Sequence, residues 1–194
     1  MVDMATTETL STHPNFVAGT WKLDPTHSTI AFTVKHLAIS KVRGAFEKFD
    51  VTIVTAPEDA DGINTIDATI DIASVNTNQA QRDGHLRTSD FFLVDEYPTA
   101  TFHSTGGTWD GDDFTIVGDL TLRGVTKQIE LKGELGGVTT DSQGNTKAGA
   151  SATTTINRHD FGVSWNAALE AGGLTLGDDV KIDIDVQVVL QPAE

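Results

Sequence analysis

Cysteine is absent from this chain of 194 residues. The chain can therefore form no disulfide, no thiolate metal site and no cysteine nucleophile. Basic residues are scarce as well, because 13 lysines and arginines accompany 28 aspartates and glutamates and leave a formal net charge of −15. Such a surface repels phosphate groups, so we expect no nucleic-acid partner.

Long hydrophobic runs are also missing, and no stretch approaches the length of a membrane span. The first residues, MVDMATTETL, have neither the basic start nor the apolar run of a secretory signal. We therefore expect a cytoplasmic protein with no integral membrane segment. The polar composition of residues 1–18 predicts disorder, which leaves one folded domain over residues 19–191.

Helical periodicity is scarce, and the dominant pattern from Gly19 onward is an alternation of apolar and polar residues. In its clearest instance the inward positions are Ile66, Ala68, Ile70 and Ile72. Alternation with a period of two is typical of half-buried strands in an antiparallel sheet. About nine such runs joined by short turns favour a closed barrel, because closure removes exposed edges; a two-sheet sandwich is the alternative fold.

Two irregularities are expected within this pattern. The apolar positions change parity between Phe46 and Phe49. This change predicts a β-bulge, which would bend the strand as barrel closure requires. Residues 136–146 are rich in glycine and polar residues, and this composition predicts a loop.

Residues 78–95 interrupt the strand pattern and are predicted to contain a short helix. Asn78 is a suitable cap for a helix from Gln79 to Leu86. Such a helix would place Arg82 and His85 one turn apart on one face. We interpret the segment as a lid or rim of the barrel, and a solvated connection between two halves of the domain is the alternative.

Five sequence blocks follow one another in an informative order. They are WKLDPTHSTIAFTVKHLAISKVRGAFEKFDVTI at residues 21–53, RDGHLRTSDFF at 82–92, YPTATFHS at 97–104, GDLTLRGVTK at 118–127 and NRHDFGVSW at 157–165. One block alone is a weak signal. In combination and in this order, they resemble the YceI family of lipocalin-like, polyisoprenoid-binding proteins.

The resemblance implies an all-β fold, namely an eight-stranded antiparallel lipocalin-like barrel with a short helical insertion between about residues 78 and 95. It further implies non-enzymatic binding, storage or transport of a long-chain amphiphilic lipid of isoprenoid, isoprenoid-quinone or fatty-acyl type. The lipid would lie in an apolar tunnel and would be the ligand, with no cofactor. The resemblance also allows a homodimer, and many members of the family are periplasmic.

Inward positions of the predicted strands and the aromatic segments supply the candidate tunnel wall. The candidates are Ile30, Phe32, Val34, Phe49, Val51, Ile66, Ile70, Phe92, Phe102, Phe114, Leu120, Leu131, Phe161 and Trp165. An eight-stranded barrel can be filled by such side chains or lined by them. Small residues at inward positions, among them Gly118 and Gly133, favour a lined cavity because a filled core would use bulk there.

Three cationic or titratable residues are candidates for the rim of the tunnel and for contact with a ligand head group: Arg82, His85 and Arg158. They lie near aromatic segments in a chain that holds few cations, and guanidinium groups suit phosphate or carboxylate heads. In the alternative interpretation, the two arginines pair internally with Asp83, Asp90 or Asp160 and only hold the lid in place.

A catalytic or metal centre would have to be built from six histidines and the carboxylates. The motifs HExxH, GxSxG and GxxxxGK[ST] are absent. A histidine-based metal-binding protein or a metal-dependent enzyme is the alternative function, with His27, His36, His85, His103 and His159 as the available residues. The more economical interpretation is that His27 and His36 satisfy backbone groups near the barrel ends, so we expect no catalytic and no metal-binding residues.

Overall fold

The computed structural model describes residues 17–56, 64–170 and 172–193. The predicted disorder of residues 1–18 therefore lies outside the described residues, except at Val17 and Ala18. No helix in these described ranges is long and apolar enough to cross a bilayer.

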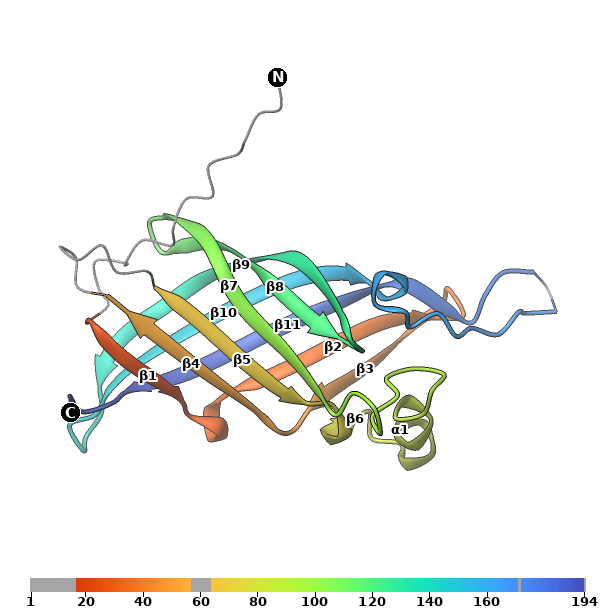
Figure 1. Ribbon diagram of the computed structural model, residues 1–194, viewed down its shortest axis with the longest axis horizontal. Coiled ribbons are helices and arrows are strands. Elements are labelled where there is room, and N and C mark those ends of the chain that lie inside the picture. Colours follow the sequence, from red (N-terminus) through yellow and green to blue (C-terminus); the bar gives the residue numbers. More distant parts are fainter. Residues whose placement is uncertain (1–16, 57–63, 171, 194) are drawn as a thin grey trace, which may run out of the picture.

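Eight antiparallel strands form a closed ring, which confirms the predicted barrel (Figure 1). Following the hydrogen-bonded order, they are β1 (Gly19–Leu23), β4 (Phe49–Thr55), β5 (Thr65–Asp71), β7 (Thr99–Asp110), β8 (Asp113–Leu122), β9 (Val125–Thr140), β10 (Thr146–Asn157) and β11 (Leu176–Leu190). Pairing of β1 with β11 closes the ring, from Trp21 opposite Leu190 to Leu23 opposite Val188. Closure leaves none of these strands with a fully exposed edge.

A hairpin extends the wall at one end of the barrel. Its strands are β2 (Thr29–His36) and β3 (Ser40–Phe46). The short turn η1 (Pro25–His27) separates β1 from β2, and both strands pair with the long strand β11. The hairpin and the helical insertion lie towards the same end of the molecule (Figure 1). This end carries the candidate mouth of the tunnel.

The parity change between Phe46 and Phe49 lies where it was predicted, but it is a two-residue break between β3 and β4 and not a bulge inside one strand. The backbone N–H groups of Glu47 and Lys48 donate to the carbonyl and hydroxyl oxygens of Ser74. Both phenylalanine rings contact the same hydrophobic cluster. The break therefore turns the chain while it keeps both rings on the inner face.

The predicted loop at residues 136–146 is wrong for most of its length. Strand β9 continues to Thr140, which pairs with Thr146 at the start of β10, so only the turn between these two residues is a loop. The glycines instead accommodate a bulge, because Leu135 pairs with Ala150 and Gly137 with Gly149. A local loss of alternation marks a bulge here, as glycine in a strand commonly does.

The helical insertion is confirmed between β5 and β7. It contains the turn η2 (Ile72–Ser74), the short strand β6 (Val75–Asn76) and the helix α1 (Ala80–Leu86), followed by turns up to residue 98. The predicted cap is wrong by one residue, since the side chain of Gln79 accepts the Arg82 N–H at 2.5 Å. Asn78 instead has a φ of 61°, a left-handed conformation that asparagine adopts more readily than most residues.

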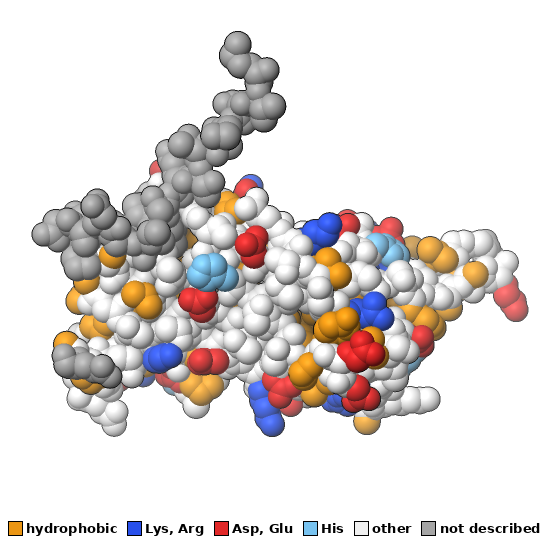
Figure 2. Space-filling model, viewed as in Figure 1, with side chains coloured by type: hydrophobic (Ala, Val, Ile, Leu, Met, Phe, Trp, Pro, Cys, Tyr) orange, Lys and Arg blue, Asp and Glu red, His pale blue; other side chains and the backbone are white. Residues whose placement is uncertain are grey.

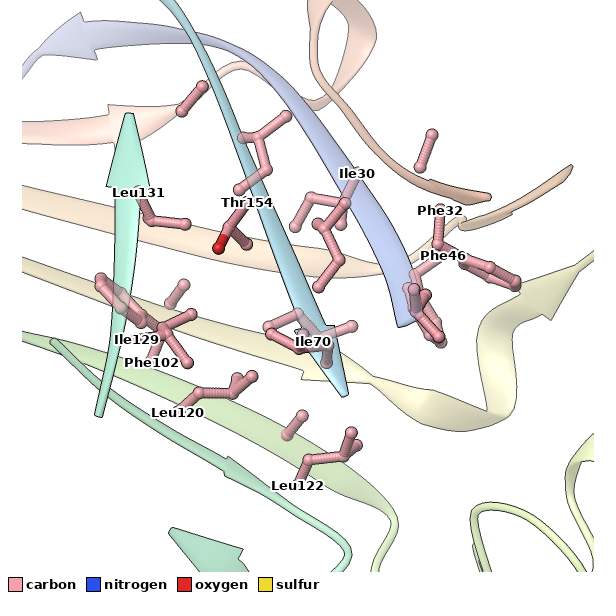
Figure 3. A pocket seen from close by; sticks show the side chains of 18 of the residues that line it. Ile30, Phe32, Phe46, Ile70, Phe102, Leu120, Leu122, Ile129, Leu131 and Thr154 are labelled. Carbon is pink, nitrogen blue, oxygen red and sulfur yellow. The ribbon is translucent and has the colours of Figure 1, made fainter. Parts of the chain in front are cut away.

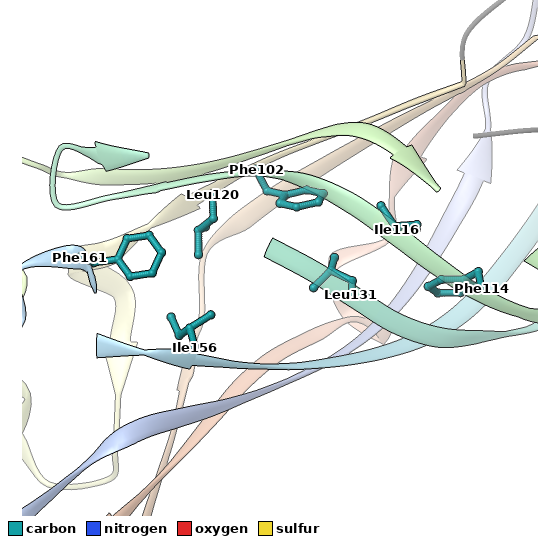
Figure 4. Close-up of a cluster of buried hydrophobic side chains, with 7 residues drawn as sticks. All are labelled: Phe102, Phe114, Ile116, Leu120, Leu131, Ile156 and Phe161. Carbon is teal, nitrogen blue, oxygen red and sulfur yellow. The ribbon is translucent and has the colours of Figure 1, made fainter. Parts of the chain in front are cut away.

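Buried apolar side chains lie along the inner wall in clusters. The largest cluster contains Phe102, Phe114, Ile116, Leu120, Leu131, Ile156 and Phe161 (Figure 4). A smaller one around Trp21, which has no exposed surface, lies at the end of the barrel opposite α1. The clusters line the wall and leave the space between facing strands open.

Candidate functional site

A cavity of about 480 Å³ occupies the inside of the barrel. Side chains from facing strands point into it, among them Ile30, Ile70, Leu120 and Leu131 (Figure 3). Its polar lining residues are Thr55, Asn64, Ser151, Thr154, His36, Arg82, His85, Arg158 and Thr175, and the others are apolar. The volume lies in the range of ligand-binding pockets, and the wall suits an apolar guest.

Glycines opposite aromatic residues keep this lumen open. Phe32 pairs with Gly44 across β2 and β3, and Phe114 pairs with Gly133 across β8 and β9. A Cβ atom built on Gly44 would lie 2.5 Å from Cζ of Phe32. Each ring therefore lies over its glycine against the barrel wall. The small inward residues were predicted to indicate a cavity. The physical reason is that each glycine leaves room for a phenylalanine ring at the wall, so that the ring does not fill the lumen.

Polar groups at the end near Trp21 are occupied by the protein itself. The hydroxyl of Thr55 donates to the carbonyl of Val17 at 2.6 Å and accepts the indole N–H of Trp21 at 3.1 Å. The side-chain oxygen of Asn64 accepts the backbone N–H of Ala56 at 2.7 Å. These groups close hydrogen bonds of the fold and are not free to orient a guest.

The mouth lies at the opposite end, where α1 and the hairpin β2–β3 meet the described residues of the segment 163–176, among them Trp165 and Thr175. An aromatic cluster joins two of these elements: the His85 ring lies 4.9 Å from Trp165 and 5.1 Å from Phe91, between ring centroids. The Nε2 atom of His85 lies 2.7 Å from Oδ2 of Asp90. The mouth thus combines aromatic faces with a polar edge, whereas the interior is almost purely apolar.

A model of the YceI-like domain matches residues 21–188 of this chain. The chain belongs to the YceI-like family. Curated relatives include the UPF0312 protein SA2479 of Staphylococcus aureus (strain N315), which is 38% identical over 167 residues, covering 84% of this chain and 94% of that protein.

Solved structures of YceI-like proteins have the same fold. The Campylobacter jejuni YCEI protein matches with a TM-score of 0.67 and 34% identity, over 81% of this chain and 90% of that one. A polyisoprenoid binding domain from Saccharophagus degradans, implicated in plant cell wall breakdown, matches with a TM-score of 0.67 over 88% of this chain and 98% of that one. At 20% identity, the second match shows the fold alone.

Most of the predicted wall residues of this YceI-like chain do line the cavity. They are Ile30, Phe32, Val34, Val51, Ile66, Ile70, Phe92, Phe102, Phe114, Leu120, Leu131 and Trp165. Phe161 does not, because it is packed inside the main cluster with 1% of its surface exposed. Phe49 does not either: it packs against the cluster around Ile30 and Ile70 and borders a separate surface pocket beside β3 and η1. The alternation predicted the facing direction correctly, but it does not distinguish a lining residue from a packed one.

Arg82 lies at the mouth and anchors the lid through Thr77, not through a carboxylate as the alternative interpretation proposed. Its Nε donates to the Thr77 hydroxyl at 2.7 Å, and its Nη2 donates to the Thr77 carbonyl at 2.8 Å. Asp83 completes the network by accepting the Thr77 N–H and hydroxyl. The exposed part of the guanidinium group still borders the cavity.

Arg158 is buried and holds the segment that follows the turn η3 (Arg158–Phe161). Its Nε donates to the carbonyl of Gly177, and its Nη1 donates to the carbonyls of Val163 and Trp165, each at 2.8 Å. Burial lowers the pKa of Arg158, and the charge of Asp178 opposes this effect. Backbone carbonyls thus replace the predicted carboxylate partners, and Arg158 shapes the mouth by positioning Trp165.

Nothing in the sequence indicated that Arg123 has a role at the mouth. Arg123 and Gly124 have φ values of 49° and 73°, the conformation of a two-residue hairpin between β8 and β9. From this position Arg123 donates to the carbonyls of Gly162 and Ser89 at 2.8 and 2.9 Å. The contact joins three segments remote in sequence, so no local pattern could indicate it.

The five histidines within the described residues are dispersed over the barrel and do not converge. His27, His85, His103 and His159 each contact a single aspartate. His36 lines the mouth of the cavity. In the part of the chain that the structure describes, no group of three or more histidines and carboxylates could hold a metal ion. The geometry therefore gives no support to the alternative function as a metal centre.

Proposed function

We propose that this YceI-like protein binds a single long-chain amphiphilic lipid of isoprenoid, isoprenoid-quinone or fatty-acyl type, and stores or transports it without chemical change. The observation that supports the proposal most directly is the apolar cavity of about 480 Å³ inside a closed barrel, whose polar lining groups lie mostly at its two ends, with Ser151 and Thr154 between them. The tail would lie among the isoleucine, leucine and phenylalanine side chains. The polar head would remain at the mouth, near Arg82 and His85.

The energetics of burial favour such a ligand. Each methylene group removed from water contributes about 0.8 kcal/mol. A tail of roughly fifteen carbons would nominally contribute ~12 kcal/mol before ordering costs, which corresponds to nanomolar affinity. Tight binding therefore follows from the tail, whereas selectivity depends on tunnel length and on the mouth.

The solved relative from Saccharophagus degradans described as a polyisoprenoid binding domain supports the proposal by analogy of fold. The dispersed histidines His27, His85, His103 and His159, each of which contacts a single aspartate, support binding over catalysis. Neither observation selects one lipid class. A competition experiment between lipids of equal tail length and different head groups would identify the preferred head group.

A lumen-filling substitution tests the proposal. Ala152 lines the cavity from β10, and the indole of Ala152→Trp would occupy the space of the tail. We expect this variant to bind neither a fluorescent fatty acid nor an isoprenoid quinone that competes with it in the wild type. Thr155→Trp, at an exposed position of the same strand, is the matched control and should bind like the wild type. Equal affinities of the wild type and Ala152→Trp, with both proteins folded, would exclude the tunnel as the binding site.

A further inference from the structure

The hairpin β2–β3 is positively charged, whereas the chain as a whole is strongly negative. No aspartate or glutamate occurs between Asp24 and Glu47, although the chain has a net charge of −15. The same stretch contains Lys35, Lys41 and Arg43. Three of the 13 cationic residues are therefore concentrated on one hairpin without a counter-charge of its own.

These three cations share the outer face of the hairpin. Lys35 is directly opposite Lys41, and Arg43 is opposite Thr33, while Phe32 and Val42 of the same strands line the cavity inside. All three side chains are exposed, and within the described residues none forms an ion pair. Like charges directly opposite each other destabilise a sheet, so the fold gains nothing from this arrangement. An external anionic surface would relieve the repulsion.

The tip of the hairpin is apolar and exposed. Ile39 has 85% of its surface exposed, and Leu174, on the neighbouring segment, has 55%. The backbone N–H of Leu37 donates to the carbonyl of Thr175 at 2.7 Å, which holds the two tips together. Leu37 and Ala38 have φ values of 54° and 59°, where hairpin tips usually have glycine or asparagine. The exposed side chain of Ile39 therefore contributes little to packing in the isolated molecule.

The tip borders the mouth of the tunnel. His36 and Leu176 line the cavity, and they lie next to Leu37 and Thr175 in the sequence. Residues 163–170 and 172–177 project from this end of the barrel, and Figure 2 shows hydrophobic side chains along them. Their only charged residue is Glu170. The cationic outer face of the hairpin, its apolar tip and the mouth of the tunnel therefore form one continuous region.

We propose that this end of the barrel docks onto the surface of an anionic lipid bilayer. Ile39 and Leu174 enter the head-group region, while Lys35, Lys41 and Arg43 contact the lipid phosphates. This combination of apolar insertion and basic side chains is the general basis of peripheral membrane binding. The docked orientation points the mouth of the tunnel at the bilayer.

The negative net charge does not prevent docking and sets its orientation. Exposed charges more than about 8 Å from the bilayer are largely screened at physiological ionic strength, so the charges around the tip determine the attraction. They are the three hairpin cations and, beside Lys35 on β11, the exposed Asp178, which contacts His159, and Asp179. The acidic faces are repelled when they approach. The proposal goes beyond lipid binding inside the tunnel, because docking does not require an occupied cavity.

Co-sedimentation with vesicles tests the proposal. We expect the wild type to bind vesicles of phosphatidylcholine mixed with phosphatidylglycerol, to bind pure phosphatidylcholine vesicles much more weakly, and to dissociate at high salt. Replacing Lys35, Lys41 and Arg43 by glutamine should weaken binding roughly a hundredfold, at about fivefold per cation. Ile39→Ser should weaken it about tenfold.

Matched controls separate docking from general charge and folding effects. Lys22, Lys127 and Lys132 are exposed on β1 and β9, and their replacement by glutamine changes the net charge equally. Val54→Ser removes an exposed apolar side chain from β4. Both control proteins should bind like the wild type, and all variants should melt at similar temperatures.

Two results would overturn the proposal. One is a wild type that does not bind the anionic vesicles, or whose binding is unchanged in the glutamine triple variant and in Ile39→Ser. The other is light scattering that shows a dimer in the wild type and a monomer in Ile39→Ser, together with no vesicle binding, because the tip would then contact a second copy of the chain. Native mass spectrometry of the bound lipid is independent of both results, so failure of docking is distinguishable from failure of lipid binding.

Discussion

Gly44, Gly118 and Gly133 keep the lumen open because each leaves room for a phenylalanine ring against the barrel wall. Any larger residue there would push a ring into the cavity or against the backbone. A Cβ at Gly118 or Gly133 would meet a backbone carbonyl as well as a ring. At Gly44 it would meet only side-chain atoms of Phe32 and Thr77, which can move. Gly44 is therefore the position where cavity volume can be changed with least damage to the fold.

Gly44→Ala should reduce lipid capacity more than stability. The new methyl group would lie 2.5 Å from Cζ of Phe32 and therefore displaces that ring into the tunnel near the mouth. We expect the affinity for a long-chain lipid to fall by about tenfold, because the ring excludes one or two methylene groups at about 0.8 kcal/mol each. Fluorescent-lipid titration measures the affinity.

The control for Gly44→Ala is Gly84→Ala in α1. No atom lies within 4 Å of a Cβ built on Gly84, so the ring packing is untouched. Alanine at this helix position should stabilise the protein by up to about 1 kcal/mol and leave lipid affinity unchanged. A lower affinity in Gly84→Ala than in Gly44→Ala would show that cavity volume is not the controlling quantity.

The lid borders the mouth of the tunnel, and both apolar packing and hydrogen bonds hold it to the barrel: Phe91 is buried, and Phe92 and Val94 pack against the cluster around Ile70. Arg82 and Asp83 hold α1 to Thr77, and Arg87 donates to the carbonyls of Ala73 and Val75. Arg123 ties the loop after α1 to the β8–β9 turn through Ser89. Local opening of such an element would break these hydrogen bonds and expose part of its apolar surface, but it does not require the barrel to unfold.

Arg123→Asn should loosen the lid and leave the hairpin intact, because asparagine also tolerates a positive φ. Loss of the bonds to Ser89 and Gly162 should increase hydrogen exchange in residues 87–97 and speed lipid release several-fold, at about 1 kcal/mol for each lost bond. Lys127→Asn on β9 removes the same charge without a hydrogen bond and serves as the control. Identical exchange and release rates in both variants would show that Arg123 does not hold the lid.

The strands and the helical insertion were predictable because their signal is local. The alternation of apolar and polar residues through Ile66 and Ile70 indicates which face of the strand is buried, and the interruption at residues 78–95 indicates the insertion. The contacts of Arg123 and Arg158 were not predictable, since their acceptors are backbone carbonyls of residues that only folding brings near. Phe161 and Trp165 show the same limit: the sequence identifies both as apolar, but only the packing places one in a cluster and the other at the mouth.

At the scale of the whole molecule, acidic side chains connect neighbouring strands away from the lid. Asp24 follows β1 and contacts Lys147 of β10 at 3.5 Å and Gln187 of β11 at 3.3 Å. Hydrogen bonding, first from the Thr26 hydroxyl and then from His27, holds the pKa of Asp24 well below its usual range. The side-chain amide of Asn145 is the main cause that lowers the pKa of Asp141 to about 2.

Stability should therefore fall in acid. A carboxylate whose pKa is lower in the folded state contributes stability above its ordinary pKa of 3.8, and this contribution is lost as the pH falls towards the folded-state value. We expect the melting temperature to decrease between about pH 4 and pH 2. Asp24→Asn should lower the melting temperature at neutral pH and reduce this acid-dependent decrease.

Asp50→Asn is the control for the acid effect, because Asp50 is exposed on β4 and its side chain makes no hydrogen bond or ion pair with the described residues. Its melting curve should follow the wild type at every pH. A wild type whose melting temperature is constant down to pH 2 would contradict the role given to Asp24 and Asp141.

The barrel is proposed to hold a lipid, and native mass spectrometry of the wild type, purified without added lipid, tests this most directly. Extraction of the same protein with organic solvent then recovers the bound molecule. We predict a species heavier than the chain by the mass of one long-chain lipid, and recovery of that lipid in the extract. An empty chain recovered repeatedly under mild conditions, which also fails to take up an added isoprenoid quinone or fatty acid, would contradict the claim.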